Sequence, residues 1–359
     1  MTAPALHAVV SGWLLGPPSG ANRRLIELLR HAATELRGDE RVTVLHAPGF
    51  APPALHPRVA WRAAPIPAGP TLRRARAERR VLPGLLRELG ATVCDHGMLP
   101  APPAPCPLLL TVHDLRAVDG HDRRPRWLAR LVLRRACRRA DAIAAPSAFT
   151  RERLRALAPE ARVELVPNGV ALPPEDGVDV VDDGALLHVG HLEPRKNLDV
   201  LLRALALLPP VERPALQLVG ADAGAGAGLR ALARRLGVAD RVELCGVEDD
   251  AAVQRRYAAA RAVVVPSRCE GFGLCALEGL AHSRPVLVAA AGALPEVVGD
   301  AGRVLPPDDA AAWARAIGAL GAADHDDDAR RRRRARAAAF GWPAAAARLV
   351  ALWRELSAR

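Results

Sequence analysis

Residues 263–278 read VVVPSRCEGFGLCALE. An apolar, β-branched run typical of a strand ends at Pro266, and a helical pattern begins shortly afterwards. The loop between them carries a carboxylate, Glu270, beside Gly271 and Gly273. Glycines at such a turn let the main chain approach a ligand closely and point amide groups at it. The segment therefore predicts a binding site at the carboxyl end of a strand.

A second carboxylate, Glu278, follows Glu270 after seven intervening residues and lies inside the expected helix. At this spacing both carboxylates can face the same site. Carboxylates accept hydrogen bonds from hydroxyl groups, which suits recognition of a ribose or a sugar, and acid–base chemistry is an alternative. The structural alternative is a turn whose glutamates only stabilise a helix N-terminus.

Short apolar runs alternate with helical patterns on both sides of this segment. The expected strands are residues 6–10, 42–47, 91–94, 108–112, 142–145, 163–166, 185–189, 215–219, 241–245, 262–265, 285–289 and 302–305. The expected helices include residues 22–36, 127–139, 198–207, 228–236, 249–259 and 274–282. This alternation is typical of parallel sheets with crossover helices. Its two successive sets in 359 residues predict an α/β protein with two Rossmann-like domains facing across a cleft.

The domain boundary is expected near LPPEDG, residues 172–177, which is a polar stretch with Pro and Gly. We therefore predict an N-terminal domain over residues 1–173, followed by a C-terminal domain over residues 174–336.

Basic charge is concentrated in the N-terminal domain. Residues 1–173 contain 26 Arg and 14 acidic residues, whereas the remainder has 24 basic and 25 acidic residues.

This asymmetry points to an anionic partner for the N-terminal domain, such as a phosphorylated acceptor or a lipid surface. Nucleic acid is not expected, because no aromatic residues are interleaved with the arginines to stack on bases. No stretch of about 20 uncharged residues could span a bilayer. The first ten residues lack the pattern of a secretory signal.

The cysteines predict neither a disulfide framework nor a zinc site, because they show no C-x-x-C spacing. We expect reduced, mostly buried thiols of a cytoplasmic protein at Cys94, Cys106, Cys137, Cys245, Cys269 and Cys275. The run DDD at residues 326–328 precedes five arginines at 330–334. We interpret it as a solvated helix face and not as a metal site.

A basic helix is expected over residues 123–135, RRPRWLARLVLRR. Its apolar residues recur at positions 127, 128, 131 and 132, while Arg130 and Arg134 lie on another face. We expect a helix packed on the core with a solvated arginine face. A helix lying at an anionic membrane surface is the alternative.

Lys196 is the only lysine among 50 basic residues, and it lies in HVGHLEPRKN, residues 188–197. A compact, mobile ammonium is suited to a position among phosphate oxygens, and the planar guanidinium of arginine is not equivalent to it. A leftover lysine on a surface helix is the alternative.

Six motifs together resemble family 4 of the retaining glycosyltransferases, which have the two-domain GT-B fold. The E-x7-E of residues 270–278 is similar to the family signature, and GHLEPRKN at 190–197 to its diphosphate-binding loop. TVHDL at 111–115 resembles the active-site histidine segment of its N-terminal domain. VPNGV at 166–170, GALPE at 292–296 and FGW at 340–342 match further segments in the family's order. The last motif implies that residues 337–359 form a C-terminal helix crossing back to the N-terminal domain.

The resemblance implies roles for individual residues. Arg195 and Lys196 would neutralise the donor diphosphate as the sugar leaves. Glu270 would hold the transferred sugar together with the segment Gly271, Phe272, Gly273 and Leu274, and His113 would contact that sugar from the other domain. The remaining donor-binding residues would be Glu278 at the ribose, Gly190 at the diphosphate, Gly20 in the loop after the first strand, and Cys245, Gly246 and Val247 beside the base. One departure is His191, where many members have an arginine.

The resemblance further implies an enzyme that moves a hexose from a nucleoside diphosphate sugar to an acceptor hydroxyl in glycan, glycolipid or polysaccharide synthesis. No metal or other cofactor is expected. The EPRKN loop is similar to that of mannosyltransferase-type members, which favours GDP-mannose. We expect an anionic or lipid-linked glycan acceptor and a cytoplasmic protein, with peripheral contact at the inner membrane face through the basic N-terminal domain as the alternative. A catalytically silent binding subunit and a sugar-nucleotide epimerase of the same architecture are the alternatives.

Overall fold

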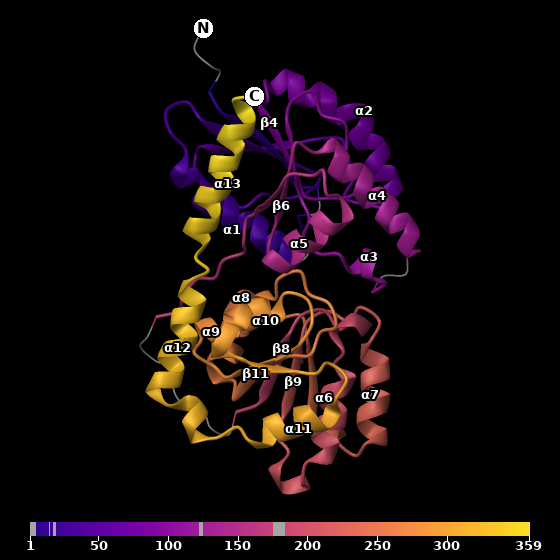
Figure 1. The fold of residues 1–359 in the computed structure, drawn as a ribbon, viewed down its shortest axis with the longest axis vertical. Coiled ribbons are helices and arrows are strands. Elements are labelled where there is room, and N and C mark those ends of the chain that lie inside the picture. The colour runs from indigo at the N-terminus through magenta and orange to yellow at the C-terminus, as the bar shows by residue number, and fades with distance from the viewer. Residues whose placement is uncertain (1–4, 14, 17–18, 122–124, 175–183) are drawn as a thin grey trace. The chain divides into compact units, whose positions relative to one another are not determined.

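The computed structural model describes residues 5–13, 15–16, 19–121, 125–174 and 184–359. The chain divides into two compact units (Figure 1). The first unit comprises residues 1–169 together with 342–359, and the second comprises residues 170–341. The second half of the expected boundary segment, residues 175–177, lies outside the described residues, as do Pro17, Pro18, Arg123 and Arg124.

The first unit is built on a seven-stranded parallel sheet in the order β3-β2-β1-β4-β5-β6-β7. The strands are β1 (His7–Ser11), β2 (Arg41–His46), β3 (Val59–Ala63), β4 (Val93–His96), β5 (Leu108–Thr111), β6 (Ala142–Ala145) and β7 (Val163–Leu165). The helices are α1 (Gly20–Glu35), α2 (Thr71–Leu89), α3 (Arg116–Asp119), α4 (Arg126–Arg139), α5 (Ala148–Leu157) and α13 (Trp342–Ser357). Strand β3 was not expected from the sequence, since VAWRA is a short edge strand that mixes apolar residues with an arginine.

The second unit contains a six-stranded parallel sheet in the order β10-β9-β8-β11-β12-β13. The strands are β8 (Leu186–Val189), β9 (Leu216–Val219), β10 (Val242–Gly246), β11 (Ala262–Val265), β12 (Val286–Ala289) and β13 (Arg303–Leu305). The α-helices are α6 (Asp199–Leu207), α7 (Gly226–Arg235), α8 (Asp250–Ala259), α9 (Leu274–Ala281), α10 (Leu294–Val298), α11 (Ala310–Gly318) and α12 (Asp327–Ala338). Two parallel α/β units confirm the predicted Rossmann-like fold class.

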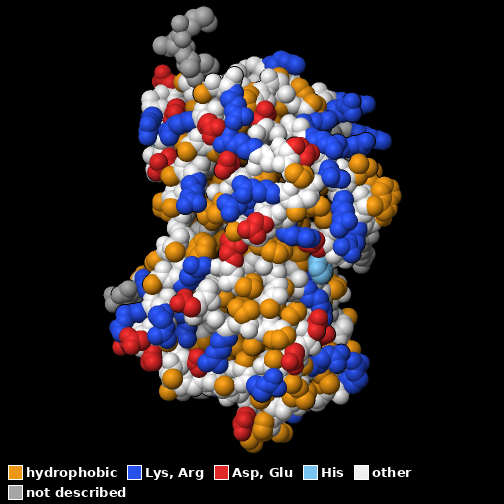
Figure 2. Space-filling model, viewed as in Figure 1, with side chains coloured by type: hydrophobic (Ala, Val, Ile, Leu, Met, Phe, Trp, Pro, Cys, Tyr) orange, Lys and Arg blue, Asp and Glu red, His pale blue; other side chains and the backbone are white. Residues whose placement is uncertain are grey.

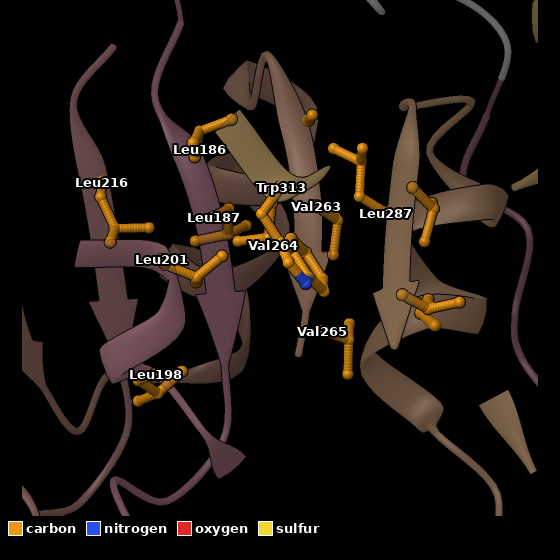
Figure 3. Packing of buried hydrophobic residues seen from close by; sticks show 14 of the residues in the cluster. Leu186, Leu187, Leu198, Leu201, Leu216, Val263, Val264, Val265, Leu287 and Trp313 are labelled. Carbon is orange, nitrogen blue, oxygen red and sulfur yellow. The ribbon is translucent and has the colours of Figure 1, made fainter. Parts of the chain in front are cut away.

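The core of the second unit lies on both faces of its sheet, as expected for parallel strands covered by helices. Strand β11 contributes Val263, Val264 and Val265, all of them buried. Figure 3 shows Trp313 of α11 lying over these strand residues beside Leu187. Its indole N–H donates a hydrogen bond of 3.0 Å to the carbonyl of Pro306. The β-branched run therefore fixes the strand at whose end the candidate site lies.

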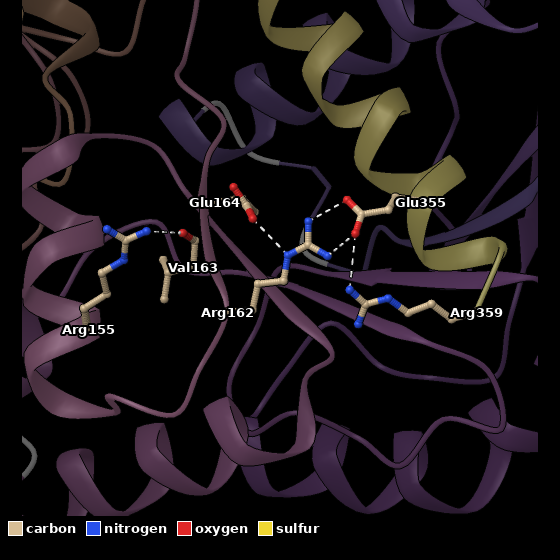
Figure 4. Close-up of polar contacts among 6 residues, drawn as sticks. All are labelled: Arg155, Arg162, Val163, Glu164, Glu355 and Arg359. Atoms are coloured by element: carbon tan, nitrogen blue, oxygen red, sulfur yellow. Dashed lines mark hydrogen bonds and ion pairs between the residues drawn. The ribbon is translucent and has the colours of Figure 1, made fainter.

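Helix α13 belongs to the first unit and packs against α1. Its apolar face is buried along its length, from Trp342 to Leu356. Trp353 donates a hydrogen bond from its indole N–H to Asp95 Oδ2, at 3.0 Å. At the end of the helix, Glu355 forms a two-pronged ion pair with Arg162, which also binds Glu164 (Figure 4). The last segment of the sequence thus completes the first unit.

Gly169 lies where the chain leaves the first unit. A Cβ atom at this position would be 2.4 Å from the main-chain nitrogen of Trp342. No side chain fits there, because the segment that starts α13 runs against this turn. The next residue, Val170, donates from its main chain to the carbonyl of Phe340, at 2.8 Å. The VPNGV and FGW motifs therefore lie side by side.

The structure confirms that the basic helix packs on the core with exposed arginines, but it corrects which face packs. Helix α4 packs on the sheet through Leu133, Ala136 and Cys137, not through the apolar positions expected from the sequence. Trp127 is 68% exposed, and Leu128 and Leu131 are also exposed. The sequence RWLARLVLRRACRR has two apolar faces, and the face with the small residues Ala136 and Cys137 comes closest to the strands. Among the described residues, no helix is long and apolar enough to cross a membrane.

The DDD run begins helix α12, where the Asp326 side chain accepts a hydrogen bond from the Ala329 main chain and caps the first turn. All three aspartates are exposed, which agrees with the interpretation of the run as a solvated helix face. All six cysteines are free, with Cys94, Cys137 and Cys269 buried and the other three half-buried.

Candidate active site

The second unit has its topological switch point between β8 and β11. From β8 the chain crosses to β9 on one side, and it returns to β11 on the other side. In an open parallel sheet, ligands bind outside the carboxyl ends of the strands at such a point. The loop after β8 carries GHLEPRKN, and the loop after β11 carries RCEGFG. The two motifs that dominate the sequence therefore lie at the edge where this fold binds ligands.

Glu270 receives two cationic side chains. Lys196 Nζ lies 2.6 Å from Glu270 Oε1, and Arg195 Nη1 lies 3.4 Å from Glu270 Oε2. All three side chains are mostly buried, with 12–13% of their surface exposed. Burial alone would oppose ionisation of Glu270, but the charges of both cations outweigh it and lower its pKa to about 2. The carboxylate is therefore ionised at any working pH.

Arg195 is held from several directions. Its Nη1 donates to the Cys269 carbonyl at 3.0 Å, and its Nη2 lies 2.6 Å from Glu193 Oε1. Its own carbonyl accepts a hydrogen bond from the main chain of Arg268. The two loops are thus connected by side-chain and main-chain contacts around two cations and two carboxylates. Glu193 is a member of this cluster that the sequence reasoning missed, although it lies inside the quoted motif.

Asn197 fixes the turn that presents both cations. A short 3₁₀ turn spans Pro194–Lys196, and Asn197 follows in a left-handed conformation with φ 56°. Its side-chain amide donates to the carbonyls of Pro266 and Pro307, at 3.1 and 2.6 Å. Asparagine tolerates this backbone conformation better than most residues. Asn197 therefore ties the loop after β8 to the end of β11.

Gly190 and His188 lie beneath the Lys196 ammonium. A Cβ atom at Gly190 would lie 3.5 Å from Lys196 Nζ, so the ammonium rests against the main chain. His188 is fully buried, and its Nδ1 donates to the Val264 carbonyl at 2.9 Å. Burial, together with the charge of Lys196, lowers the pKa of His188 to about 4. This imidazole is neutral at pH 7.

Gly292 supports the other side of Glu270. A Cβ atom there would lie 2.4 Å from the Glu270 carbonyl oxygen, and its φ of +60° also favours glycine. The adjacent Ala293 donates from its main chain to that same carbonyl, at 3.0 Å. The turn of Gly271, Phe272 and Gly273 then leads into α9, which begins at Leu274. Main-chain N–H groups of a helix's first turn can receive an anion.

Glu278 has partners of its own. It is buried, and its Oε2 accepts a hydrogen bond of 2.7 Å from the hydroxyl of Tyr257 in α8. The Tyr257 ring stacks on His282 with 5.2 Å between centroids, and His282 Nδ1 donates to the Glu278 carbonyl. The two glutamates of the E-x7-E motif therefore have different side-chain partners. No sequence motif pointed to Tyr257, which is distinguished only by being the single tyrosine of the chain.

The remaining predicted positions of the second unit lie at another strand. Cys245 and Gly246 end β10, which is separated from β8 by β9. The Gly246 carbonyl accepts a hydrogen bond of 2.7 Å from Gly220. Val247 follows with 61% of its surface exposed. His191, the position of the departure from the family pattern, is also exposed.

Two predicted residues belong to the first unit. His113 follows β5, where it lies next to Gly97 at the end of β4, and Gly20 is the first residue of α1. Burial, with the positive charges of Arg24 and Arg116, lowers the pKa of His113 to about 3. The side chain is therefore a neutral imidazole at pH 7. It lies at the carboxyl edge of its sheet, where a ligand of this unit would bind.

Family models match both units. The model described as Glycosyltransferase Family 4 matches residues 18–172, and the one described as Glycosyl transferases group 1 matches residues 183–322. The chain belongs to the family 4 glycosyltransferases. The resemblance stated from its six motifs is confirmed, as is the GT-B fold.

Two glycosyltransferases of related sequence each match part of the chain. The D-inositol 3-phosphate glycosyltransferase of Streptomyces coelicolor is 40% identical over 176 residues, which cover 45% of this chain and 38% of that protein. The D-inositol 3-phosphate glycosyltransferase 2 of Catenulispora acidiphila is 39% identical over 190 residues, covering 50% and 43%. The matches thus span about two fifths of the length of these relatives.

Solved structures match the fold over nearly the whole chain. Sucrose-phosphate synthase from Thermosynechococcus elongatus gives a TM-score of 0.79 at 22% identity, covering 98% of this chain and 99% of that one. HepE of Anabaena in complex with UDP-glucose gives 0.73 at 20% identity, covering 99% and 100%. WaaG, a glycosyltransferase of lipopolysaccharide biosynthesis, gives 0.73 at 19% identity, covering 96% and 99%.

Proposed function

We propose that this protein is a retaining glycosyltransferase that moves a hexose from a nucleoside diphosphate sugar to an acceptor hydroxyl. The observation that carries the proposal is the convergence of Lys196 and Arg195 on Glu270 at the switch point of the second unit. Two buried cations beside a helix N-terminus suit a diphosphate. A carboxylate among them suits the hydroxyls of a sugar.

The charges of the cluster suggest how a donor would bind. Without a donor, Glu270 and Glu193 neutralise Lys196 and Arg195. A diphosphate would compete for the two cations, which would free Glu270 to accept hydrogen bonds from the sugar hydroxyls. Interactions that grow as negative charge develops on the leaving phosphate would accelerate the transfer. Arg195 and Lys196 are proposed for this role, with Gly190 and the turn of Gly271, Phe272, Gly273 and Leu274 as main-chain contacts.

The transfer would proceed with retention at the anomeric carbon. The bond from that carbon to the diphosphate oxygen breaks, and the bond to the acceptor oxygen forms on the same face. The acceptor proton passes to the departing phosphate, so no protein nucleophile takes part. Neutral His113 is proposed to donate or accept a hydrogen bond at the transferred sugar. Glu278 is proposed to bind the ribose, with Gly20 at the phosphates and the Cys245–Val247 segment at the base.

The sugar and the acceptor form the finer part of the proposal. The EPRKN loop favours GDP-mannose as donor, while the HepE structure holds UDP-glucose, so both are the first donors to test. Relatives carry the name D-inositol 3-phosphate glycosyltransferase. Together with the excess of arginine in residues 1–173, this supports an anionic acceptor, either a phosphorylated polyol or a lipid-linked glycan. Metal independence and a place in cytoplasmic glycan or polysaccharide synthesis are part of the same proposal.

A donor screen tests the proposal. The protein is incubated with UDP-, GDP- and ADP-sugars, with and without inositol phosphate, and released nucleotide and glycoside are measured. We expect one donor class to raise the melting temperature and to yield an α-linked product from an α-linked donor. A product of inverted configuration would contradict retention. An epimerised donor without transfer would favour the epimerase, and binding without turnover of any donor would favour a silent subunit.

A further inference from the structure

Helix α4 presents an apolar patch to solvent. The patch consists of Trp127, Leu128 and Leu131, which are 68%, 39% and 40% exposed. At about 100° per residue these three side chains fall within an arc of about 100° on one side of the helix. The opposite side holds the helix on the core through Leu133 and its neighbours. The patch therefore lies away from the side of α4 that packs on the core.

Arginines surround this patch. Helix α4 contains six arginines and no acidic residue, and all six arginines are exposed. Arg134 donates to the Leu157 carbonyl, and Arg138 pairs with Glu160 at 3.3 Å. Within the described part of the chain, no ion pair or hydrogen bond engages the guanidinium of Arg130 or Arg135. Figure 2 shows hydrophobic and Lys/Arg side chains together where α4 lies in Figure 1.

Helix α2 extends the basic surface. Leu82 and Leu86 of α2 belong to the same buried cluster as Leu133 of α4, so both helices cover the same face of the sheet. Right-handed crossovers from β3 to β4 and from β5 to β6 require this placement. The outward side of α2 carries exposed arginines at positions 73, 76, 79, 80 and 87, and Leu72 is 76% exposed.

We infer that α4 docks this protein on an anionic membrane surface, with Trp127, Leu128 and Leu131 entering the headgroup region. Tryptophan and leucine at one level, ringed by arginines, match the interfacial environment, where apolar surface is buried and guanidinium groups reach lipid phosphates. The excess of positive charge favours a lipid surface over an apolar groove of another protein. This inference concerns binding and does not depend on which sugar is transferred.

Vesicle flotation tests the docking. The full chain is mixed with vesicles of phosphatidylcholine alone or with 30 mole percent phosphatidylglycerol (about one anionic lipid in three), at low and at physiological salt. We expect binding to the anionic vesicles only, weakened by salt because charge pairing is screened. The inference would be overturned if the protein failed to bind anionic vesicles at both salt concentrations, or if it bound equally to both vesicle types.

Paired variants assign the binding to α4. Trp127→Ser with Leu131→Ser should lower partitioning at least about tenfold, since two apolar side chains lose their burial. The matched control replaces Leu207 and Val211 of the second unit, which are 61% and 92% exposed, by serine. This control should bind vesicles as the wild type does. Unchanged melting curves show that each variant is folded. Equal binding of the α4 variant and the control would contradict the assignment.

Charge reversal tests the arginines. Arg130→Glu with Arg135→Glu should lower partitioning at least about tenfold, and Arg234→Glu with Arg235→Glu in α7 should lower it much less. An equal loss of vesicle partitioning in both variants would show that only the net charge of the protein matters. The assignment of a specific role to α4 would then be wrong.

Trp127 also reports the depth of binding. All six tryptophans are described, and Trp127 alone is more than half exposed, while Trp61 is half-buried and the others are buried. Brominated phosphatidylglycerol should quench the emission of the wild type, and Trp127→Phe should keep binding but lose the quenching. Vesicle binding without quenching would show that the protein adsorbs to the surface while Trp127 stays outside the headgroup region, which would contradict the proposed docking. Loss of a lipid-free dimer in the Trp127→Ser, Leu131→Ser variant, without vesicle binding, would indicate a second copy as the partner instead.

Turnover on a soluble acceptor separates this inference from the proposed function. The α4 variants should keep wild-type turnover, because α4 contributes no proposed site residue. If no donor is turned over, the vesicle assays still decide the docking.

Discussion

Lys196 is the only lysine of the chain, and its ammonium lies 2.6 Å from Glu270 Oε1. Its rarity pointed to the loop, but rarity is no physical argument. The physical argument is the buried cluster with Glu270 and Arg195 at the carboxyl ends of β8 and β11. A compact ammonium fits against the Gly190 main chain, where a wider guanidinium would have to displace its surroundings.

Lys196→Ala should lower turnover by more than tenfold while the protein stays folded, because one of two charges opposite the diphosphate is lost. Lys196→Arg should restore part of the turnover, since it keeps the charge but changes the geometry. Initial rates at saturating donor, with circular dichroism as the folding control, measure both. Near-normal turnover of Lys196→Ala would remove this residue from the site.

Tyr257→Phe tests the orientation of Glu278. Removing the hydroxyl leaves a buried carboxylate oxygen without its 2.7 Å donor, at a cost of about 1–3 kcal/mol. If Glu278 binds the ribose, which is remote from the reacting carbon, the donor KM should rise about fivefold to tenfold with little change in kcat. A fall in kcat at constant KM would instead place Glu278 at the chemical step. An unchanged KM with lower thermal stability would give Tyr257 a structural role only.

At the scale of elements, α13 shows how the end of the sequence stabilises the first unit. Trp353 binds Asp95 at the end of β4, and Arg354 pairs with Glu40 before β2 at 2.7 Å. Burial raises the pKa of Asp95 to about 6, and the hydrogen bond from Trp353 and the charge of Arg24 only partly offset this effect. An ionised Asp95 is therefore destabilising relative to the unfolded chain.

The sign of this effect gives a pH prediction. Because the folded pKa of Asp95 is raised, its contribution to stability is fully present below about pH 4 and is lost as pH rises through about 6. Asp95→Asn removes the titration but keeps an acceptor for the indole of Trp353. We expect the variant to gain stability relative to wild type between pH 4 and 7, as measured by urea unfolding at several pH values. A pH-independent difference would show that Asp95 does not titrate in this range.

At the scale of the whole molecule, each unit has its own sheet and its own buried cluster. Two tryptophans give a matched pair, since Trp353 lies in the first unit and Trp313 in the second, both fully buried. Replacing either by alanine should cost about 3–5 kcal/mol in its own unit. Calorimetry of the full chain should show that each variant lowers the temperature of a different unfolding transition.

A nucleoside diphosphate should then raise the temperature of only one transition, the one whose temperature Trp313→Ala lowers. The reason is that the proposed diphosphate site lies in the second unit. A single transition, moved equally by both variants and by the nucleotide, would show that the two units unfold together. Stabilisation of the transition lowered by Trp353→Ala would place the nucleotide in the first unit.

Sequence alone predicted much of the fold because its signals are local. Apolar runs such as VVVP at 263–266 and the glycine turns after them depend on neighbouring residues, so most strands, both sheets and the RCEGFG and EPRKN loops could be placed. The same periodicity failed for α4, because its sequence offers two apolar faces and cannot tell which one meets a sheet. It also failed for β3, an edge strand with little pattern.

The sequence by itself thus determined the fold class, the family and the loops that carry the candidate site. Only the tertiary structure decided which residues contact one another in the candidate site. Lys196 and Glu270 are 74 residues apart, and Tyr257 reaches Glu278 from another helix. Asn197 joins two loops through main-chain carbonyls that no motif records. Such contacts are set by how the strands are ordered in a sheet and how closely helices pack on it, and these are properties of the folded chain as a whole.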